Sequence, residues 1–328
     1  MSETPPVVWV LADDRAGNRG QCLGVAEALG FPPTIKEIRY GLWGGWPNAL
    51  LGASFAGLTA QSRRALASPW PDIAIGAGRR VAPVSRRIKK LSGGRTFLVH
   101  IMDPGGPGRD AFDLIAVPRH DRPTLAPNVL TVTGAPHRIR PEALAVAADI
   151  WRPRFAHLPK PWFALLVGGG TKGRALGAAL LAELGRRADA LAKGAGGSLL
   201  VTTSRRTDPA ALESFLGTLT VPSHVHRWDQ GGENPYLGYL ALADAVIVTG
   251  ESMSMCSEAC ATGAPVYIYA RDEFITPKYA RLHAALYESG LARPLAETSS
   301  YVPWSHPKLN AADAIAAEIR ERFGTRKI

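Results

Sequence analysis

The stretch "ADAVIVTGESMSMCSEACATGAPVYIYA" (residues 243–270) determines how the rest of the chain can fold. An apolar run ends at Gly250, a short helical segment follows, and a second apolar run covers residues 266–269. Runs of this length, rich in Val, Ile and Tyr, predict two buried strands joined by a helix. Because a strand–helix–strand crossover makes its two strands parallel, the stretch predicts an α/β domain.

The same alternation of strand-like and helical segments extends over both halves of the chain. It runs from Val7 to residue 136, is interrupted by a helix and a Pro-rich link, and restarts at residue 162. We therefore expect two Rossmann-like α/β domains facing across a cleft. The expected division is an N-terminal domain over 1–150, a C-terminal domain over 151–305, and a terminal helix over 306–328 that could pack back on the N-terminal domain.

The composition is that of a folded protein without a membrane span. Of 328 residues, 46% are hydrophobic and 20% are charged, and no apolar run is long enough to cross a bilayer. Three cysteines and the absence of a secretory leader predict reduced thiols and a cytoplasmic location. A net charge of +10 fits anionic ligands or lipids and equally an ordinary Arg-rich surface. Because charge without a recognition motif does not indicate nucleic acid, we expect no nucleic-acid partner.

Two loops that follow predicted strands carry residues suited to phosphate. In "VGGGTKG" (167–173) the glycines let the backbone approach an anion closely, and a helix N-terminus follows. In "TTSRRT" (202–207) hydroxyl and guanidinium groups gather at a strand end. The alternatives are a tight turn and a capped turn with solvated arginines. The candidate nucleotide-sugar ligands in these loops are Gly169, Gly170, Thr171, Lys172, Ser204, Arg205 and Arg206.

The quoted stretch adds a helix N-terminus and one carboxylate. Ser252 and Ser254 can cap the helix after Gly250, where free N–H groups suit a diphosphate. Glu258 lies one turn further, where it would repel a diphosphate but accept hydrogen bonds from the vicinal hydroxyls of a ribose. The alternative is a capped helix with an exposed acid. Two further candidate ligands are Met253, between the serines, and Asn234, at a helix start beside the expected sugar.

Residues 243–268 resemble the strand–loop–helix of glycosyltransferases with the GT-B fold. In that family a Gly/Ser loop precedes a helix with the pattern S-E-A-x-x-x-G-x-P, and its glutamate binds the ribose of the nucleotide; the matching residue here is Glu258. The resemblance implies a GT-B-like fold, a nucleotide-diphospho-sugar donor of the UDP type, and no bound metal or cofactor.

Segments spread over residues 7–320 resemble a narrower family, the mitochondrial-fission "elongated mitochondria" family. They include "LADDRAGNRGQ", "FLVHIMDP" and "TGAPHRI". The resemblance again implies a GT-B-like fold. In plant members it implies recruitment of a dynamin-type division protein to an organelle surface, which does not carry over automatically to this chain.

Loops in the N-terminal half supply candidate residues for the acceptor side and for catalysis. A carboxylate there would deprotonate the acceptor hydroxyl. The candidates follow predicted strand ends: Asp14, with Asp13 as its alternative, and Asp103. An equally good interpretation makes the "DDR" turn structural. His100 lies within a strand, so a buried core histidine is expected. The candidates for binding an acceptor phosphate are Asn18, Arg19, Gly78 and Arg79.

The segment "YGLWGGWPNALLGASFAGL" (40–58) is apolar and contains Trp43 and Trp46. It is either a buried corner between helices or an interfacial anchor that places its tryptophans at headgroup depth. With the positive net charge, the second interpretation predicts peripheral binding to an anionic membrane on the cytoplasmic face, close to a lipid-linked acceptor.

The sequence therefore leaves two alternative functions. The first is a metal-independent glycosyltransferase that moves a sugar from a nucleotide-diphospho-sugar to a membrane-associated or lipid-linked acceptor. The second is a catalytically inactive scaffold that recruits partners at a membrane surface, because fold alone does not decide function. An NAD-dependent sugar epimerase is disfavoured, since the first strand leads into "DDRAGNRG" and not into a dinucleotide fingerprint.

Overall fold

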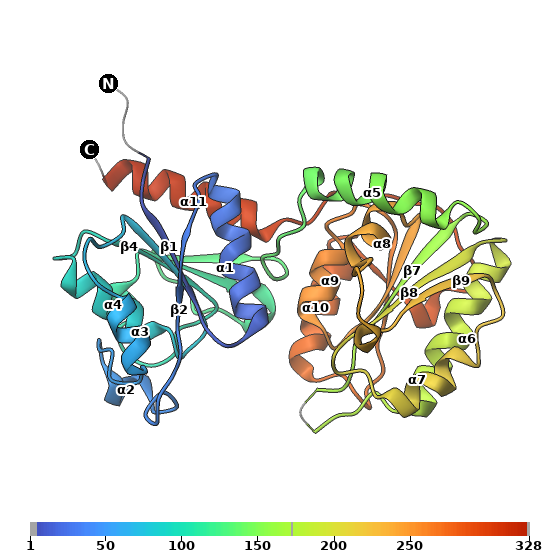
Figure 1. Cartoon of the computed structure of the whole chain (residues 1–328), viewed down its shortest axis with the longest axis horizontal. Coiled ribbons are helices and arrows are strands. Elements are labelled where there is room, and N and C mark those ends of the chain that lie inside the picture. Colours follow the sequence, from blue (N-terminus) through green and yellow to red (C-terminus); the bar gives the residue numbers. More distant parts are fainter. Residues whose placement is uncertain (1–4, 172, 327–328) are drawn as a thin grey trace. The chain divides into compact units, whose positions relative to one another are not determined.

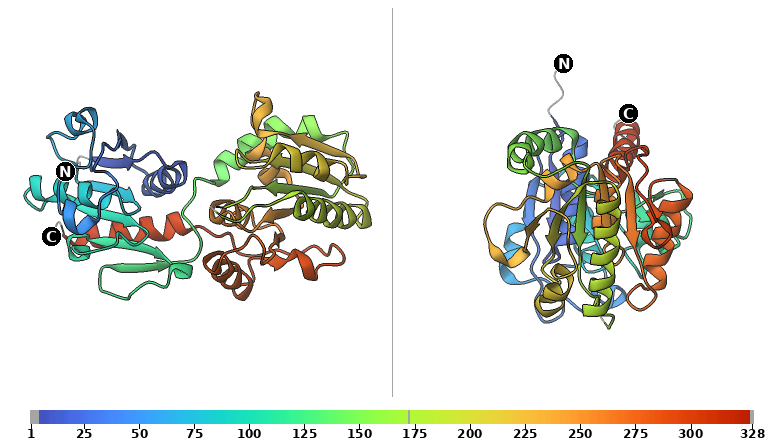
Figure 2. Two further views of the ribbon diagram at one scale, coloured as in Figure 1. Left: turned by 90° about the horizontal axis from the view of Figure 1, so that it is seen from below. Right: turned by 90° about the vertical axis from the view of Figure 1, so that its right-hand side faces the viewer.

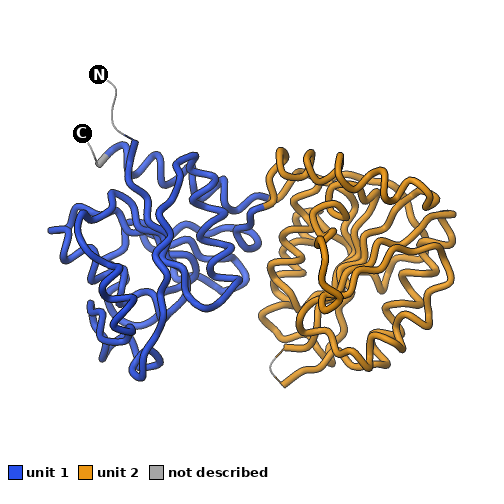
Figure 3. The backbone as a smooth tube through the Cα atoms, in the orientation of Figure 1, with its two compact units in different colours: residues 1–138, 310–328 blue, residues 139–309 orange. Residues whose placement is uncertain are grey.

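The computed structural model describes residues 5–171 and 173–326, which form two compact units (Figure 3). Unit 1 comprises residues 1–138 and 310–328, and unit 2 comprises residues 139–309. The chain therefore passes from unit 1 into unit 2 and returns to unit 1 for its last helix.

Unit 1 is built on a six-stranded parallel sheet in the order β2-β1-β3-β4-β5-β6. Its strands are β1 (Val8–Ala12), β2 (Thr34–Glu37), β3 (Ile73–Ala77), β4 (Phe97–Ile101), β5 (Leu114–Pro118) and β6 (Val129–Val132). Its helices are α1 (Ala16–Leu29), α2 (Asn48–Leu51), α3 (Ala60–Ala65), α4 (Ala82–Leu91) and α11 (Ala311–Arg326), with 3₁₀ turns η1 (Arg109–Ala111) and η2 (Arg119–Asp121).

Helices cover both faces of the unit 1 sheet (Figures 1 and 2), so its inner strands β1, β3, β4 and β5 are buried on both sides. Along β1, Val8 and Val10 pack toward α1 and α11, whereas Trp9 and Leu11 pack on the opposite face with α4. The terminal helix belongs to this core, because Ile315 of α11 is fully buried against the same face as α1.

Unit 2 repeats the plan with the order β12-β11-β10-β7-β8-β9, again all parallel. Its strands are β7 (Trp162–Val167), β8 (Ser198–Thr203), β9 (Ser223–His226), β10 (Ala245–Thr249), β11 (Val266–Tyr269) and β12 (Arg293–Pro294). Its helices are α5 (Pro141–Phe155), α6 (Ala178–Gly194), α7 (Pro209–Leu216), α8 (Tyr236–Leu242), α9 (Met253–Ala259) and α10 (Pro277–Glu288), with η3 (Trp228–Gln230) and η4 (Leu295–Glu297).

The core of unit 2 also has two layers. Phe163 and Leu165 of β7 pack toward α6 and α7, while Ala164 and Leu166 pack toward α5, α8, α9 and α10. As expected for parallel strands covered by helices, successive side chains enter opposite cores. Cys256 and Cys260 are buried in the second of these cores as small apolar side chains.

The strand orders fix where each unit can bind a ligand. In unit 1 the direction of winding reverses between β1 and β3, and in unit 2 it reverses between β7 and β10. Open parallel sheets bind ligands outside the carboxyl ends of their strands at such switch points. The loops that follow these four strands therefore define the candidate sites.

Candidate functional site

The switch point of unit 2 is closed by two hydrogen bonds between the loops after β7 and β10. The amide N–H of Gly168 donates to Thr249 Oγ1 at 2.8 Å, and the amide N–H of Gly169 donates to Glu251 Oε1 at 2.8 Å. A side chain on Gly168 would overlap the Glu251 carboxylate, so the glycine makes room for the acid. The glycine loop is therefore shaped by the protein's own carboxylate.

Glu251 is a site residue that the sequence analysis missed. Its side chain is only 1% exposed, and within the part of the chain that the structure describes its Oε2 has no hydrogen-bond partner. Burial raises the pKa of Glu251, which favours the protonated form. The available signal was its position directly after a strand end, where ligand-binding loops begin.

The glycine loop packs tightly against the loop after β8. A side chain on Gly169 would overlap the backbone carbonyl of Arg206, and Arg206 Nη1 donates to the carbonyl of Gly170 at 3.3 Å. A hollow of about 420 Å³ lies beside this contact, and Gly170, Thr171 and Arg206 line it. The structure thus brings these three predicted residues together, whereas Lys172 lies outside the described residues.

The loop after β8 also borders a second, smaller hollow of about 190 Å³. Ser204, Arg205 and Trp228 are among its lining residues, and Trp228 is 53% exposed. The backbone N–H of Trp228 donates to Thr203 Oγ1 at 2.9 Å, which fixes the start of η3 to the end of β8. An exposed tryptophan beside arginines was not identified from the sequence, because η3 lies in a loop without a regular pattern.

The Ser204 side chain is used within its own turn. Its Oγ accepts a hydrogen bond from the Arg206 amide at 3.2 Å, and its amide donates to Thr207 Oγ1 at 2.9 Å. Thr207 Oγ1 in turn donates to the Gly168 carbonyl at 2.6 Å. The loop after β8 is therefore held in a fixed conformation by hydroxyl groups, which leaves its arginine side chains on the surface.

The helix after β10 begins as expected. Ser252 is the N-cap of α9, and its side chain accepts a hydrogen bond from the Met255 amide at 3.4 Å. Met253 and Ser254 occupy the first turn and are half-buried. The imidazole of His283 contacts the Gly250 carbonyl at 2.8 Å and supports the turn that leads into the helix.

Glu258 is half-buried one turn further along α9 and is bound to a tyrosine. The Tyr236 hydroxyl donates to Glu258 Oε2 at 2.5 Å. Burial raises the pKa of Glu258 to about 7, and the bond from Tyr236 counteracts that rise. Asn234 positions this tyrosine, because its Oδ1 accepts the Tyr236 amide N–H at 3.0 Å. Glu258 and Asn234 are thus linked through one residue.

The switch point of unit 1 holds a second polar cluster. Asn18 Nδ2 donates to the buried Asp13 at 3.0 Å and lies 3.5 Å from the Ala77 carbonyl, which joins the loops after β1 and β3. Asp14 is exposed and forms an ion pair with Arg80. Gly78 has φ +76, and a side chain there would crowd Asn18. Asp14, Asn18 and Gly78 therefore belong to one site.

The other candidates of unit 1 have separate partners. Arg19 pairs with Glu37 at 2.6 Å. Asp103 accepts the Gly105 amide N–H at 2.8 Å and pairs with Arg109 at 2.8 Å. These bonds account for both side chains locally. As expected, His100 is a buried core residue, and burial lowers its pKa to about 3.

The apolar segment 40–58 is anchored by buried Leu51 and Leu58 and exposes several of its other apolar side chains. Exposed fractions are 98% for Leu42, 52% for Trp43, 49% for Trp46 and 71% for Leu50, so the buried-corner interpretation is wrong for these side chains. Arg79 holds the segment by donating to the Trp46 carbonyl at 3.0 Å and the Gly45 carbonyl at 3.3 Å. In the residues that the structure describes, no helix has both the length and the apolar character needed to cross a bilayer.

Comparison with known sequences identifies the family. The model of the family described as mitochondrial fission ELM1 matches residues 16–323. The chain belongs to the mitochondrial fission ELM1 family. This ELM1-family chain is 30% identical to the mitochondrial fission protein ELM1 of Arabidopsis thaliana, over 85% of this chain and 70% of the plant protein. It is 27% identical to the uncharacterized protein RP120 of Rickettsia prowazekii, over 95% of this chain and 97% of that protein.

Solved structures similar to the ELM1-family chain show its fold. A putative UDP-N-acetylglucosamine 2-epimerase of Listeria monocytogenes matches with a TM-score of 0.56 and 12% identity over 98% of both chains. The UDP-GlcNAc 2-epimerase of Methanocaldococcus jannaschii matches with a TM-score of 0.54 and 12% identity, over 96% of this chain and 98% of that one. At these identities the likeness is one of fold. The predicted α/β fold of two Rossmann-like domains, GT-B-like in type, is confirmed.

Proposed function

We propose that this chain binds a nucleotide-diphospho-sugar at the switch point of unit 2 and transfers the sugar to a membrane-associated or lipid-linked acceptor bound by unit 1. The observation that carries the proposal is the gathering of candidate ligands at one sheet edge. The loops after β7, β8 and β10 supply Gly170, Arg206 and the start of α9 around that switch point. Fold likeness to nucleotide-sugar enzymes is compatible with this assignment but does not establish it.

Each end of the donor has a candidate partner. Trp228 offers an exposed ring for a nucleobase, and the neighbouring Arg205 offers a guanidinium group. Glu258 offers a carboxylate for the ribose hydroxyls. Because the pKa of Glu258 is about 7, the charged acceptor form is well populated at and above neutral pH.

The diphosphate would lie among the arginines and the serines at the start of α9. Positive charge placed where the leaving group develops negative charge lowers the barrier to transfer. A charged Glu251 would oppose this binding. Burial raises the pKa of Glu251, and this shift toward the neutral form weakens that repulsion.

The transfer itself requires a base on the acceptor side. We assign this role to Asp14 or Asp103, one of which would accept the proton of the acceptor hydroxyl. The acceptor oxygen then bonds to the anomeric carbon of the sugar, and the bond to the nucleoside diphosphate breaks with its electrons leaving on the phosphate oxygen. Asp14 is the better placed, since it lies at the switch point of unit 1 and is exposed.

The acceptor would reach unit 1 from a membrane surface. Leu42, Trp43, Trp46 and Leu50 present apolar and aromatic side chains from one short segment, as interfacial anchors do. The net charge of +10 favours anionic lipid. On this proposal the protein is cytoplasmic and binds peripherally to the inner face of the plasma membrane.

The second candidate is a catalytically inactive scaffold at a membrane surface. It is favoured by the 30% identity to a plant protein named for mitochondrial fission, because that name does not refer to sugar transfer. A scaffold of this kind would retain the fold and the exposed segment 42–50 without turnover of a nucleotide sugar.

Thermal unfolding with nucleotides tests the donor site. UDP, GDP, ADP, CMP and their sugar conjugates would be added to the wild type, to Glu258→Ala and to Glu288→Ala, an exposed glutamate of α10 that serves as the control. A ligand at 100 times its Kd stabilises the folded state by about 2.7 kcal/mol. We expect one nucleoside diphosphate to raise the Tm of the wild type and of Glu288→Ala but not that of Glu258→Ala.

The outcomes separate the candidates. If no nucleotide raises the Tm, the donor site is refuted and the scaffold function is supported. If a nucleotide binds and its sugar conjugate is transferred or hydrolysed, the scaffold is refuted. Sedimentation with anionic vesicles tests the membrane contact separately, and a Trp43→Ala, Trp46→Ala double variant that sediments as well as the wild type would refute that contact.

A further inference from the structure

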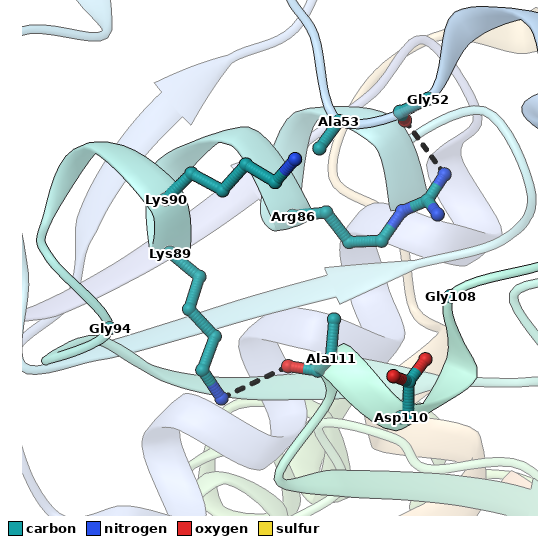
Figure 4. A pocket seen from close by; sticks show the side chains of 9 residues that line it. All are labelled: Gly52, Ala53, Arg86, Lys89, Lys90, Gly94, Gly108, Asp110 and Ala111. Carbon is teal, nitrogen blue, oxygen red and sulfur yellow. Dashed lines mark hydrogen bonds between the residues drawn. The ribbon is translucent and has the colours of Figure 1, made fainter.

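Unit 1 contains a pocket of about 570 Å³ on the α4 side of its sheet (Figure 4). Its lining comes from Gly52 and Ala53 after α2, from Arg86, Lys89 and Lys90 on α4, and from the segment around η1. The lining residues do not include the loops after β1 and β3, so the pocket is separate from the switch point described above.

Arg86 places a buried positive charge at this pocket. It is only 8% exposed, and its guanidinium donates to the carbonyls of Pro107 and Gly52, both at 2.7 Å. These partners are neutral, and among the residues that the structure describes no carboxylate forms an ion pair with it. Its Nε is buried and has no hydrogen-bond partner within the same described residues. The carboxylate of Asp110, which lines the same pocket, acts electrostatically on Arg86 without forming an ion pair with it. A buried cation without a paired counter-charge is costly, so an anion close by would stabilise it.

The two lysines differ in their pairing. Lys89 Nζ binds Asp113 at 2.7 Å and the Ala111 carbonyl at 3.0 Å, so its charge is neutralised. Lys90 lies one residue further on the same helix, is exposed, and has no ion pair in the described segments 5–171 and 173–326. Figure 4 shows its amine directed over the pocket toward Ala53. Lys90 can therefore contact a bound anion directly.

The surroundings favour an anion that carries an organic group. Asp110 is the one carboxylate in the described lining, against three basic side chains. Ala53, Ala111 and the stems of the lysines supply apolar walls. A free phosphate ion would fill only a small part of a pocket this large.

We propose that this pocket of unit 1 binds a phosphate monoester, with Lys90 contacting the phosphate and Arg86 supplying a fixed positive charge behind it. The phosphate can belong to a soluble metabolite or to the headgroup of a lipid. Leu50 of the exposed segment lies in α2, directly before the pocket residues Gly52 and Ala53, so a headgroup could enter from a membrane that this segment contacts. The site is independent of the donor site proposed for unit 2.

Calorimetric titration with glycerol 3-phosphate and sedimentation with vesicles containing phosphatidic acid test both sources. The wild type would be compared with Lys90→Gln and with Arg64→Gln, which removes one positive charge from an exposed position on α3 of the same unit. Because a hydrogen bond to a charged group contributes about 1.5–3 kcal/mol, Lys90→Gln should weaken binding about tenfold or more. Arg64→Gln should bind as the wild type does.

Each result decides between outcomes. Saturable binding of glycerol 3-phosphate that depends on Lys90 supports a soluble ligand, and Lys90-dependent binding of phosphatidic acid vesicles alone supports a lipid headgroup. The proposal is overturned if neither probe binds, or if Lys90→Gln and Arg64→Gln weaken binding equally. The same proteins are also titrated with UDP. This titration distinguishes a failure of phosphate binding at the pocket of unit 1 from a failure of nucleotide binding at the donor site of unit 2.

Discussion

The carboxylate of Glu251 accepts the amide N–H of Gly169, and this bond joins the ends of β10 and β7 across the switch point of unit 2. A phosphate that needed the same amide would have to displace the carboxylate. The glycine loop and the acid therefore act as one unit, and substitutions on either side of the bond should reveal it.

Gly168→Ala should destabilise unit 2 by about 1–3 kcal/mol, because the added methyl group would overlap the Glu251 carboxylate. Gly177→Ala is the matched control, since φ there is −77° and the added methyl group would meet no atom within 4 Å. Urea unfolding of both variants checks the prediction. Equal urea midpoints for the two variants would contradict it, because they would show that the loop after β7 adapts to the methyl group without loss of stability.

Glu251→Gln should change how stability depends on pH. Burial raises the pKa of Glu251 in the folded state above its unfolded value, so the folded state holds the proton more tightly. The wild type then loses stability as pH rises through the unfolded pKa toward the folded one. Because glutamine does not titrate, the variant should become more stable relative to the wild type as the pH rises above about 4, the unfolded pKa of a glutamate. A constant difference above this pH would contradict the prediction.

Tyr236→Phe should raise the pKa of Glu258 above its value of about 7, because the tyrosine hydroxyl stabilises the charged carboxylate. Carbon-detected NMR titration of the glutamate side chains measures this directly. Tyr287→Phe is the control, a tyrosine of α10 that also packs against the core of unit 2. If both variants leave the titration unchanged, the Tyr236–Glu258 bond has no electrostatic effect.

Gly108→Ala tests how tightly the guanidinium group of Arg86 packs against the backbone. The residue has φ +87, and an added methyl group would overlap the guanidinium. Gly30→Ala, at φ +80 with no atom within 4 Å of the added methyl group, incurs only the left-handed strain of about 1–2 kcal/mol. We expect Gly108→Ala to cost about 1–3 kcal/mol more than this control in thermal unfolding.

The pattern of the sequence predicts the longer helices and most strands of both sheets, because most strands are short apolar runs bounded by loops. It does not predict the two-residue strand β12 or the short helices α2 and α3. It also predicts the cap at Ser252 and the burial of His100. It does not identify Glu251, since an acid after a strand looks the same whether it faces solvent or a neighbouring amide. Nor does it identify the pairing of Tyr236 with Glu258, or the pocket at Arg86. These contacts join residues that are distant in sequence, so the periodic pattern of apolar residues cannot predict them.

Removal of residues 310–328 should unfold unit 1 and leave unit 2 folded. Ile315 and Ile319 of α11 are fully buried against the core that α1 also covers, and each such side chain contributes about 1.5–3 kcal/mol. Limited proteolysis checks this, with a resistant fragment over about residues 139–309 as the expected product. A truncated protein as resistant in its N-terminal half as the full chain would refute it.

The return of the chain to unit 1 also sets an order on synthesis at the ribosome. Unit 2 is one continuous segment and can fold as soon as residue 309 has emerged, whereas unit 1 lacks α11 until the chain beyond residue 310 has also emerged. Domains normally fold in the order in which they are made. Here unit 1 is begun first and completed last, and the apolar face that α11 covers stays exposed in the meantime. Transiently exposed apolar surface of this kind is what makes nascent chains prone to aggregate and in need of chaperones.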